Sequence, residues 1–386
     1  MNQQISKWRL SVAPMMDWTD RHCRYFHRLI TRRTRLYTEM VTTGALLHGD
    51  VQRHLDFDAA EHPLALQLGG SEPDDLARCA LLAQQWGYDE INLNCGCPSP
   101  RVQRGAFGAC LMNEAALVGK AVKAMRDAVG DVVGVALPVT VKHRIGLGRE
   151  RNDGLVRDFV GTVAEAGCEV FIVHARNAWL EGLSPKDNRE VPPLRYEVVH
   201  RLKGEFPALK FIINGGFNDN TAIAEQLDQV DGVMVGRAAY HAPALMARWD
   251  DALDGWLDSA AGSPEARASS CADPGDEWRQ QVEDAMVAYM SRLRDVPWSH
   301  AARHMLGLWH GRPGARCWRQ VWSDHRQKSL SPSAVQRLAT QARLQAVTPV
   351  GVATWEIKTR EVKTRERSGP APNLTHALHG PHVPRV

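Results

Sequence analysis

The sequence predicts an α/β fold, a (β/α)8 barrel followed by a small C-terminal helical bundle. Between residues 10 and 237, eight short apolar or β-branched runs alternate with longer amphipathic stretches. Repeated strand, helix and strand units form parallel strands joined by helical crossovers. Eight such units in one stretch fit a closed barrel better than an open doubly wound sheet. The open sheet remains the alternative, because periodicity does not show whether a sheet closes.

The eight runs are the expected barrel strands. In chain order they lie at residues 10–15, 36–41, 64–68, 90–95, 139–144, 170–176, 210–215 and 232–237. Apolar residues at helical spacing predict crossover helices at residues 77–86, 115–128 and 155–166.

Composition divides the chain into four segments. The barrel is expected over residues 1–256. Residues 257–276 are expected to form a linker, because this stretch is rich in Ser, Ala, Gly, Pro and Asp. Over residues 277–346 apolar residues return at helical spacing, which predicts a helical domain. Residues 347–386 carry prolines and charges with little periodicity, so a disordered tail is expected.

The composition is that of a soluble globular protein, since 44% of the 386 residues are hydrophobic and 24% are charged. No apolar run approaches the roughly 18 residues that a membrane span needs. The N-terminal residues show no apolar segment of the kind found in secretory signals. The eight cysteines are scattered singly, which favours a reducing setting. We therefore expect a cytoplasmic monomer without membrane attachment.

Positive charge is concentrated in one part of the chain, although the net charge is only +3. Between residues 296 and 346, eight basic residues stand against one acid, Asp324, so the rest of the chain is net negative. Such a concentration is typical of a surface that binds a polyanion. A solvated helical face is the alternative. The basic residues are Arg303, Arg312, Arg316, Arg319, Arg326, Lys328, Arg337 and Arg343.

Polar side chains occur at the expected C-terminal ends of six of the eight strands. Barrels of this kind carry their active sites at that face, and folding alone does not require so many polar groups there. They include Gln67, Asn94, Cys97, Lys142, Arg144, His174, Arg176 and Asn214.

Glycines follow the last two strands, in Asn214-Gly215-Gly216 and Gly236-Arg237. Such glycines let backbone amides approach a phosphate, and the positive end of a following helix adds to the attraction. Arg237 adds a charge that suits a phosphate monoester. Tight turns beside a surface arginine are the alternative.

These residues carry a resemblance to a known family. The run Asn92-Leu93-Asn94-Cys95-Gly96-Cys97-Pro98, followed by Arg101-Val102-Gln103 and residues 108–112, resembles the signature of the tRNA-dihydrouridine synthases. Ala13-Pro14-Met15, Gln67, Lys142, His174-Ala175-Arg176 and the two glycine motifs match as well. Residues 182–194 and 303–308 resemble the A subfamily specifically. The resemblance runs from residue 10 to residue 324 and leaves the tail unexplained.

The resemblance implies an enzyme that reduces uridine to dihydrouridine in tRNA. It implies an FMN-binding barrel and a helical domain that together hold the tRNA, with NADPH as the reductant. Hydride would pass to C6 of a D-loop uracil, typically uridine 20 or 20a.

Cys97 is the catalytic residue that the resemblance implies, as the donor of a proton to C5. A thiol in a loop after a strand end is exposed and can act in this way. The alternatives are a buried small side chain, or one half of a Cys95–Cys97 redox or metal pair. A metal site needs about four ligands, and no second cysteine pair with suitable spacing is present. Cys95 departs from the family pattern, where this position is usually aliphatic, and Cys110 is expected to pack.

Three side chains are expected to contact the flavin ring. Lys142 would lie beside its N1 and O2 atoms, where the negative charge of the reduced ring develops. Gln67 would bond the N3 and O4 edge, and His174 the ring or the ribityl chain. A snorkelling lysine and a core histidine are the alternatives. The other expected cofactor contacts are Pro14, Met15, Met16, Asn214, Gly215, Gly216, Gly236 and Arg237.

Seven side chains are expected to contact the tRNA. Asn94 and Arg176 would hold the extruded uracil by its polar edge. Lys186 and Arg189, and Arg303 and Arg316 from the helical segment, would contact phosphates, with a solvated surface as the alternative. Arg144 completes this set. Trp298, Trp309, Trp318 and Trp322 are expected to pack in a core rather than stack on bases.

Two other functions remain open at this point. A flavin barrel acting on a small molecule would also use a phosphate site and Lys142, but would not need the basic helical segment. An RNA-binding module without catalysis would not need Gln67, Lys142 and Cys97 together.

Overall fold

All eight expected strands are present. A computed structural model describes residues 7–130, 137–255, 262–269 and 271–347. The strands are β1 (Leu10–Val12), β2 (Leu36–Thr42), β3 (Leu64–Gly69), β4 (Glu90–Cys95), β5 (Val139–Arg144), β6 (Val170–His174), β7 (Lys210–Asn214) and β8 (Gly232–Val235). The bounds of β4 and β5 agree with the expected ranges, and the other strands differ by a few residues at their ends.

The strands form one parallel sheet in the order β1-β8-β7-β6-β5-β4-β3-β2. Its two edges meet at a parallel bridge between Ser11 and Arg35. There the Val12 amide donates to the Arg35 carbonyl at 3.0 Å. The sheet is therefore a nearly closed (β/α)8 barrel, and the open-sheet alternative is wrong.

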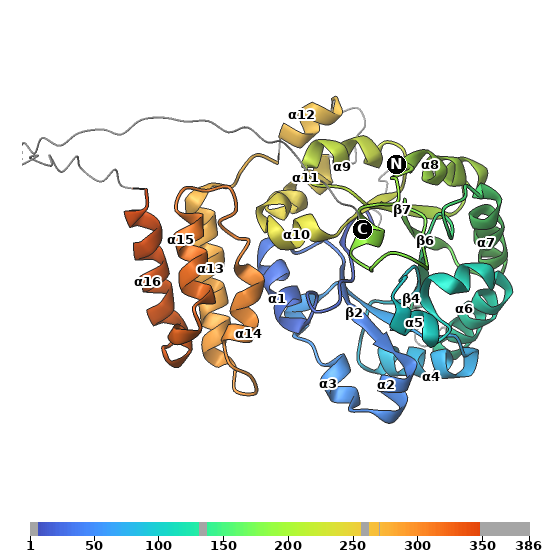
Figure 1. The fold of residues 1–386 in the computed structure, drawn as a ribbon, viewed down its shortest axis with the longest axis horizontal. Helices are drawn as coiled ribbons and strands as arrows, with labels where there is room; N and C mark the ends of the chain where they lie inside the picture. Colours follow the sequence, from blue (N-terminus) through green and yellow to red (C-terminus); the bar gives the residue numbers. More distant parts are fainter. Residues whose placement is uncertain (1–6, 131–136, 256–261, 270, 348–386) are drawn as a thin grey trace, which may run out of the picture. The chain divides into compact units, whose positions relative to one another are not determined.

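Helices lie around the barrel strands, as Figure 1 shows. The expected crossover helices are confirmed as α4 (Pro73–Gln85), α6 (Ala115–Val129) and α7 (Asp153–Glu165). The others in this part are α1 (Arg21–Ile30), α2 (Thr43–His48), α3 (Val51–Leu55), α5 (Pro100–Arg104), α8 (Tyr196–Glu205), α9 (Asn220–Leu227), α10 (Arg237–His241), α11 (Trp249–Gly255) and α12 (Pro264–Ser269).

Side chains along each strand alternate between the barrel interior and the surrounding helix layer. On β4, Ile91 and Leu93 belong to the large apolar core shared with the helices. Glu90, Asn92 and Asn94 alternate with them and are also buried. On the far side of the barrel, interior positions are apolar instead, and include Ile172, Ile212 and Met234. Apart from Ala65 on β3, and His174 and Asn214 at the ends of β6 and β7, the barrel interior is therefore polar along β3, β4 and β5 and apolar along β6, β7 and β8.

Helices α13 (Gly275–Arg292), α14 (Ser299–Ala302), α15 (Ala315–Ser323) and α16 (Pro332–Gln345) lie side by side in Figure 1. At their centre the buried carboxylate of Glu283 accepts indole N–H bonds from Trp309, Trp318 and Trp322 at 3.0–3.1 Å. Trp298 packs edge-on against Trp322 with ring centroids 5.7 Å apart. The expected core role is confirmed for Trp309, Trp318 and Trp322, whereas Trp298 is only partly buried against them.

The expected linker contains the short helix α12, which is attached to the barrel. Arg267 of α12 is 4% exposed, and its guanidinium bonds both carboxylate oxygens of Asp228 after α9. The division of the chain into a catalytic domain and a tRNA-binding domain stays a prediction. The expected tail spans residues 347–386, and from residue 348 on it lies outside the described residues.

In the parts of the chain that the structure describes, every helix is too short or too polar to cross a bilayer.

Candidate active site

A cavity of about 800 Å³ opens at the C-terminal ends of the barrel strands. Its volume is in the range of small-molecule and cofactor sites, and its position is that of active sites in such barrels. Three expected tRNA contacts, Lys186, Arg303 and Arg316, lie outside its wall. The expected site residues that line it are Pro14, Met15, Met16, Gln67, Asn94, Cys97, Lys142, Arg144, His174, Arg176, Arg189, Asn214, Gly215, Gly216, Gly236 and Arg237.

Cys97 lies on the cavity wall, in the loop after β4, and is partly exposed. Its amide donates to Asn94 Oδ1 at 3.0 Å, and its carbonyl accepts from the Ala109 amide at 2.9 Å. Gly108 has a φ of +77°, and a Cβ there would lie 2.6 Å from the Cys97 carbonyl oxygen. Because only glycine tolerates both conditions, Gly108 fixes the backbone that carries the thiol.

Cys95 lies in a different environment, although only one residue separates it from Cys97. It is fully buried in the core between barrel and helices, and burial raises the pKa of its thiol well above the ordinary value. It does not line the cavity. Within the described residues, no group of three or more His, Cys, Asp or Glu side chains is placed to hold a metal. The arrangement therefore does not support a Cys95–Cys97 pair acting as one unit.

Lys142 lies at the end of β5 on the cavity wall. Its Nζ donates to Asn214 Oδ1 at 3.3 Å, while Asn214 Nδ2 donates to the Met234 carbonyl at 2.8 Å. Burial lowers the pKa of Lys142 to about 7, with a further lowering by the charge of Arg144. An anion beside such a lysine would restore its charged form. The site is therefore suited to a ligand that carries or develops negative charge.

Arg144 is more constrained than a free substrate contact would be. Its Nε donates to the Gly96 carbonyl at 3.0 Å, and its Nη1 donates to the carbonyls of Asn177 and Asn188 at 3.1 and 2.8 Å. The side chain is only 3% exposed. Arg144 thus ties the Cys97 loop to the loops after β6.

His174 lies at the end of β6. Burial, together with the charges of Arg144 and Lys142, holds its pKa well below the ordinary value. The imidazole is therefore neutral at physiological pH and offers one donor and one acceptor.

The glycines after β7 are required by the backbone, and side chains pack closely against them. Gly215 and Gly216 have φ of +122° and +80°, where other residues are strained. A Cβ on Gly216 would lie 2.6 Å from Leu194 Cδ1. Gly236 differs, because a Cβ there would meet only Ala13 Cβ, at 3.8 Å. At Gly236 the protein itself leaves room for a side chain, and Gly236 lines the cavity.

The expected contribution of helix N-termini to a phosphate site is weaker than the sequence suggested. The N-terminus of α9 is already capped, because Asp219 accepts a bond from the Ala222 amide at 2.8 Å. Helix α10 has five residues, so its dipole is small. Backbone amides near the glycines and the Arg237 guanidinium remain as anion donors.

Arg237 is paired with a carboxylate. Its Nη1 lies 2.5 Å from Glu190 Oε1, on the loop after β6, and its Nη2 donates to the Arg189 carbonyl at 3.5 Å. The Glu190 carboxylate therefore bonds the group that is expected to bind phosphate.

The loop between β6 and α8 brings further positive charge to the cavity rim. Arg176 Nη1 donates to the carbonyls of Glu190 and Pro192, which anchors this loop. Arg189 lines the cavity, whereas Lys186 is exposed on the same loop outside it. Among the described residues, five cations and two carboxylates, Asp17 and Glu190, line the cavity. The balance favours an anionic ligand.

Arg303 has a structural partner that the sequence did not reveal. Its guanidinium donates to the carboxylate of Asp20 at 2.7 Å, and Asp20 caps the N-terminus of α1. Arg312 and Arg343 pair with Asp276, and Arg326 pairs with Asp324. The basic residues of this segment that show no ion pair in the described part are all exposed: Arg316, Arg319, Lys328 and Arg337.

Sequence reasoning missed several cavity residues. Asp17 lines the wall with a φ of +65°, rare for a residue other than glycine, and its amide donates to the Glu39 carboxylate. Trp18 lies beside it and stacks on Tyr240 with centroids 4.6 Å apart. Both directly follow the expected Pro14–Met16 contacts, so extending that segment would have found them. Glu190 likewise follows the expected contact Arg189, but its pairing with Arg237 had no sequence signal, because that partner lies 47 residues away.

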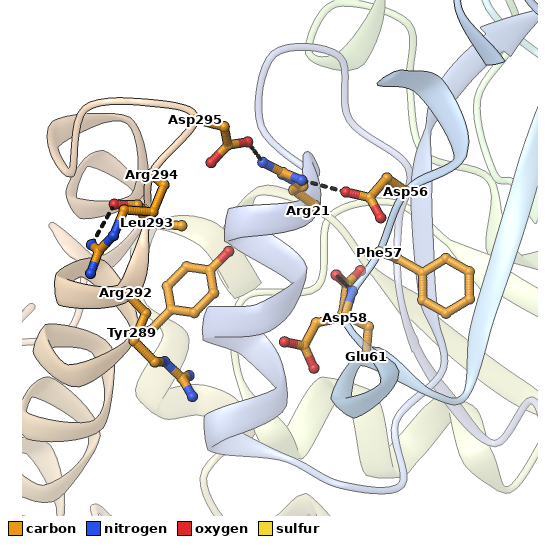
Figure 2. A pocket seen from close by; sticks show the side chains of 10 residues that line it. All are labelled: Arg21, Asp56, Phe57, Asp58, Glu61, Tyr289, Arg292, Leu293, Arg294 and Asp295. Atoms are coloured by element: carbon orange, nitrogen blue, oxygen red, sulfur yellow. Dashed lines mark hydrogen bonds and ion pairs between the residues drawn. The ribbon is translucent and has the colours of Figure 1, made fainter. Parts of the chain in front are cut away.

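A second cavity, of about 440 Å³, lies between α1, the segment after α3, and α13 (Figure 2). In it Arg21 bonds the carboxylates of Asp56 and Asp295, which joins the barrel to the helical segment. Four carboxylates and three guanidinium groups line this cavity. It therefore lacks the positive balance of the first cavity and is a poorer site for a phosphorylated ligand.

The fold and the first cavity define a β/α-barrel protein whose site combines anion-binding groups with a thiol. The chain belongs to the dihydrouridine synthase (Dus) family, which it matches over residues 11–346.

Individual relatives cover most of the chain. A tRNA-dihydrouridine(20/20a) synthase of Pseudomonas putida is 53% identical over 327 residues, which are 85% of this chain and 91% of the relative. The Xanthomonas campestris protein of the same name is 52% identical over 340 residues, 87% of this chain and 95% of the relative. An Escherichia coli protein, also so named, is 51% identical over 325 residues, 83% and 91% of the two chains.

Proposed function

We propose that this protein reduces uridine to 5,6-dihydrouridine in the D-loop of tRNA, at positions 20 and 20a. The names of its relatives point to this reaction. The observation that carries the proposal is the cavity, which gathers Cys97, Lys142 and the Gly215–Gly216 pair from the ends of three strands. We also propose that the protein acts as a monomer in the cytoplasm.

The residues of the cavity fit FMN. The open space at Gly236 and the guanidinium of Arg237 suit a phosphate monoester. Lys142, Gln67 and His174 supply a cation, an amide and a neutral imidazole for the polar edges of the ring. Pro14, Met15 and Met16 supply an apolar wall. When bound and reduced by NADPH, FMN supplies a hydride to C6 of the uracil.

Cys97 completes the reduction by giving its thiol proton to C5. One hydride and one proton then saturate the C5–C6 double bond, and the sulfur is left as a thiolate. Lys142 and Arg144 both interact electrostatically with Cys97, so their charges stabilise that thiolate. The hydrogen bonds of the Cys97 backbone keep the thiol at the cavity wall while the proton moves.

Binding of tRNA must supply the free energy that extrudes the uridine from its stack. Arg176 and Arg189 lie at the cavity, where they can hold the base and its phosphate. Lys186 on the nearby loop and the exposed Arg316 on α15 are the outer contacts in this proposal. Arg319, Lys328 and Arg337 join Arg316, because they carry exposed charge without an ion pair in the described part of the chain.

The test is reconstitution followed by site mapping. We expect purified protein to contain or accept FMN, and to form dihydrouridine at positions 20 and 20a of unmodified tRNA with NADPH. Cells that lack their own enzyme of this kind should regain those two dihydrouridines when this chain is expressed. Failure to bind FMN, or dihydrouridine at other positions only, would contradict the proposal.

A further inference from the structure

A continuous line of hydrogen bonds runs through the polar half of the barrel, from Glu90 to the Cys97 loop. Glu90 Oε1 accepts from the Thr140 hydroxyl at 2.6 Å, and Thr140 Oγ1 accepts from Asn92 Nδ2 at 2.8 Å. Asn92 Oδ1 accepts from Gln67 Nε2 at 2.7 Å. Gln67 Oε1 then accepts from Asn94 Nδ2 at 2.9 Å. The residues alternate along β3, β4 and β5 and are at most 8% exposed.

The groups at the two ends of this line both fix the same donor-to-acceptor direction for its hydrogen bonds. At the far end, Asn94 Oδ1 accepts from the amides of Gly96 and Cys97 at 3.1 and 3.0 Å, and a backbone amide can only donate. At the other end a carboxylate can only accept. An amide side chain between them has one orientation that satisfies both neighbours. The amides of Asn92, Gln67 and Asn94 are thus oriented from both sides.

Glu90 is held as a fixed acceptor at the barrel floor. Its Oε2 accepts from Trp8 Nε1 at 2.6 Å, and the Arg35 guanidinium lies 3.3 Å away as the counter-charge. Its Oε1 also accepts from the Tyr37 hydroxyl at 2.8 Å. Every group that contacts the carboxylate is a donor. The Thr140 hydroxyl therefore donates to Glu90 at 2.6 Å, with the Ile91 carbonyl a more distant acceptor at 3.4 Å, and it accepts from Asn92.

We propose that Glu90, acting through Thr140 and Asn92, is a positioning residue that orients the amides of Gln67 and Asn94 at the cavity. The effect of this orientation on catalysis rests on the proposed function. The orientation of the amides itself does not depend on that function. Both lone pairs of Asn94 Oδ1 are used by the Cys97 loop, so Asn94 can offer only an N–H to a ligand. A donor suits a carbonyl oxygen of uracil and repels an amino group. Gln67 keeps both a donor and an acceptor for its ligand.

The variant Thr140→Val tests the line, because it removes one hydroxyl with almost no change of volume. Thr140→Ser restores the hydroxyl. Thr34→Val is the matched control, since Thr34 is also fully buried but lies outside the line. Glu90→Gln keeps the size of the side chain and makes it neutral.

Hydrogen exchange of the flavin-free protein tests this line of hydrogen bonds without depending on enzymatic activity. We expect the amides of residues 93–97 to exchange about tenfold faster in Thr140→Val, since one buried hydrogen bond no longer orients the side-chain amides. Thr140→Ser and Thr34→Val should exchange like the parent, and Glu90→Gln should show a smaller increase. Unchanged exchange in Thr140→Val, an equal increase in Thr34→Val, or a Glu90→Gln protein that matches the parent would each overturn the proposal.

A second measurement tests whether this line of hydrogen bonds affects the rate of uridine reduction. In single turnovers of the FMN-reduced protein, uridine reduction should slow about tenfold in Thr140→Val, with tRNA affinity unchanged and the rate recovered in Thr140→Ser. Equal rates in Thr140→Val and the parent would overturn the catalytic consequence. If the parent itself forms no dihydrouridine, the proposed function fails, while the exchange experiment still decides the orientation.

Discussion

Substitution of Cys97 and Cys95 in turn separates the proposed catalytic thiol from its buried neighbour. Cys97 is partly exposed at the cavity wall and Cys95 is fully buried in the core. Loss of a general acid costs about 100- to 10,000-fold in rate. We therefore expect Cys97→Ala to slow uridine reduction by about this factor, with little change in tRNA affinity. Cys95→Ala should leave the rate close to that of the parent.

The same two variants should affect stability in the opposite order. Cys95→Ala removes a fully buried sulfur and leaves a small void, so the free energy of unfolding should fall by about 1–2 kcal/mol. Cys97→Ala removes a partly exposed atom, so its effect should stay within about 0.5 kcal/mol. Urea unfolding of the two purified variants measures both values.

Single-turnover reduction by the flavin-reduced variants, with dihydrouridine quantified in the tRNA, measures the chemical step. Brief treatment with iodoacetamide and peptide mapping provides a second readout. We expect Cys97 to be alkylated and Cys95 protected, because burial raises the pKa of the Cys95 thiol. A normal rate in Cys97→Ala, together with a slow Cys95→Ala protein, would refute the reasoning.

Three further outcomes follow from charges at the site. With a pKa of about 7, Lys142 is charged below that pH and neutral above it. FMN binding to the flavin-free protein, measured by fluorescence titration, should therefore weaken as the pH rises through 7. A Lys142→Met protein should lack this pH-dependent change in FMN affinity. Glu190→Gln frees Arg237 from its ion pair, so FMN should bind about two- to fivefold more tightly in the same titration, and weaker binding would contradict competition between carboxylate and phosphate. Arg303→Ala should lower the free energy of unfolding by up to about 1 kcal/mol through loss of the Asp20 pair. Arg316→Ala should instead weaken tRNA binding and reduce its salt dependence by about one released counterion. Filter binding at several salt concentrations distinguishes the two arginines.

The fold and most of the candidate site could be predicted because both depend on local patterns. Short apolar runs separated by amphipathic helices specify parallel strands, and the C-terminal ends of those strands meet at one face. Gln67, Asn94, Lys142 and Asn214 lie at such ends and line one cavity. The period of two along β4 also places Glu90 and Asn92 in the barrel interior, a signal that was available and not used.

The basic helical segment shows a property that local sequence patterns do not predict, namely which arginines form ion pairs. Its excess charge was visible in the sequence, yet Arg303 pairs with Asp20 and Arg312 with Asp276, while Arg316 stays exposed. Which arginine remains exposed and without an ion pair depends on acids that lie 283 residues away in one case and 36 in the other. Nothing within a few residues of an arginine distinguishes these cases.

The sequence alone identified Cys97 as the candidate thiol and predicted the glycines after β7, because each signal depends on residues adjacent in the chain. The closure of the sheet was decided by the tertiary structure, because β1 pairs with β8 and bridges to Arg35. The tertiary structure decided that Cys95 is buried, that Arg144 ties the Cys97 loop to the loops after β6, and that Glu190 pairs with Arg237. It also decided the line of bonds from Glu90 to Asn94. Burial and pairing depend on distances and solvent exclusion that exist only once the barrel is packed.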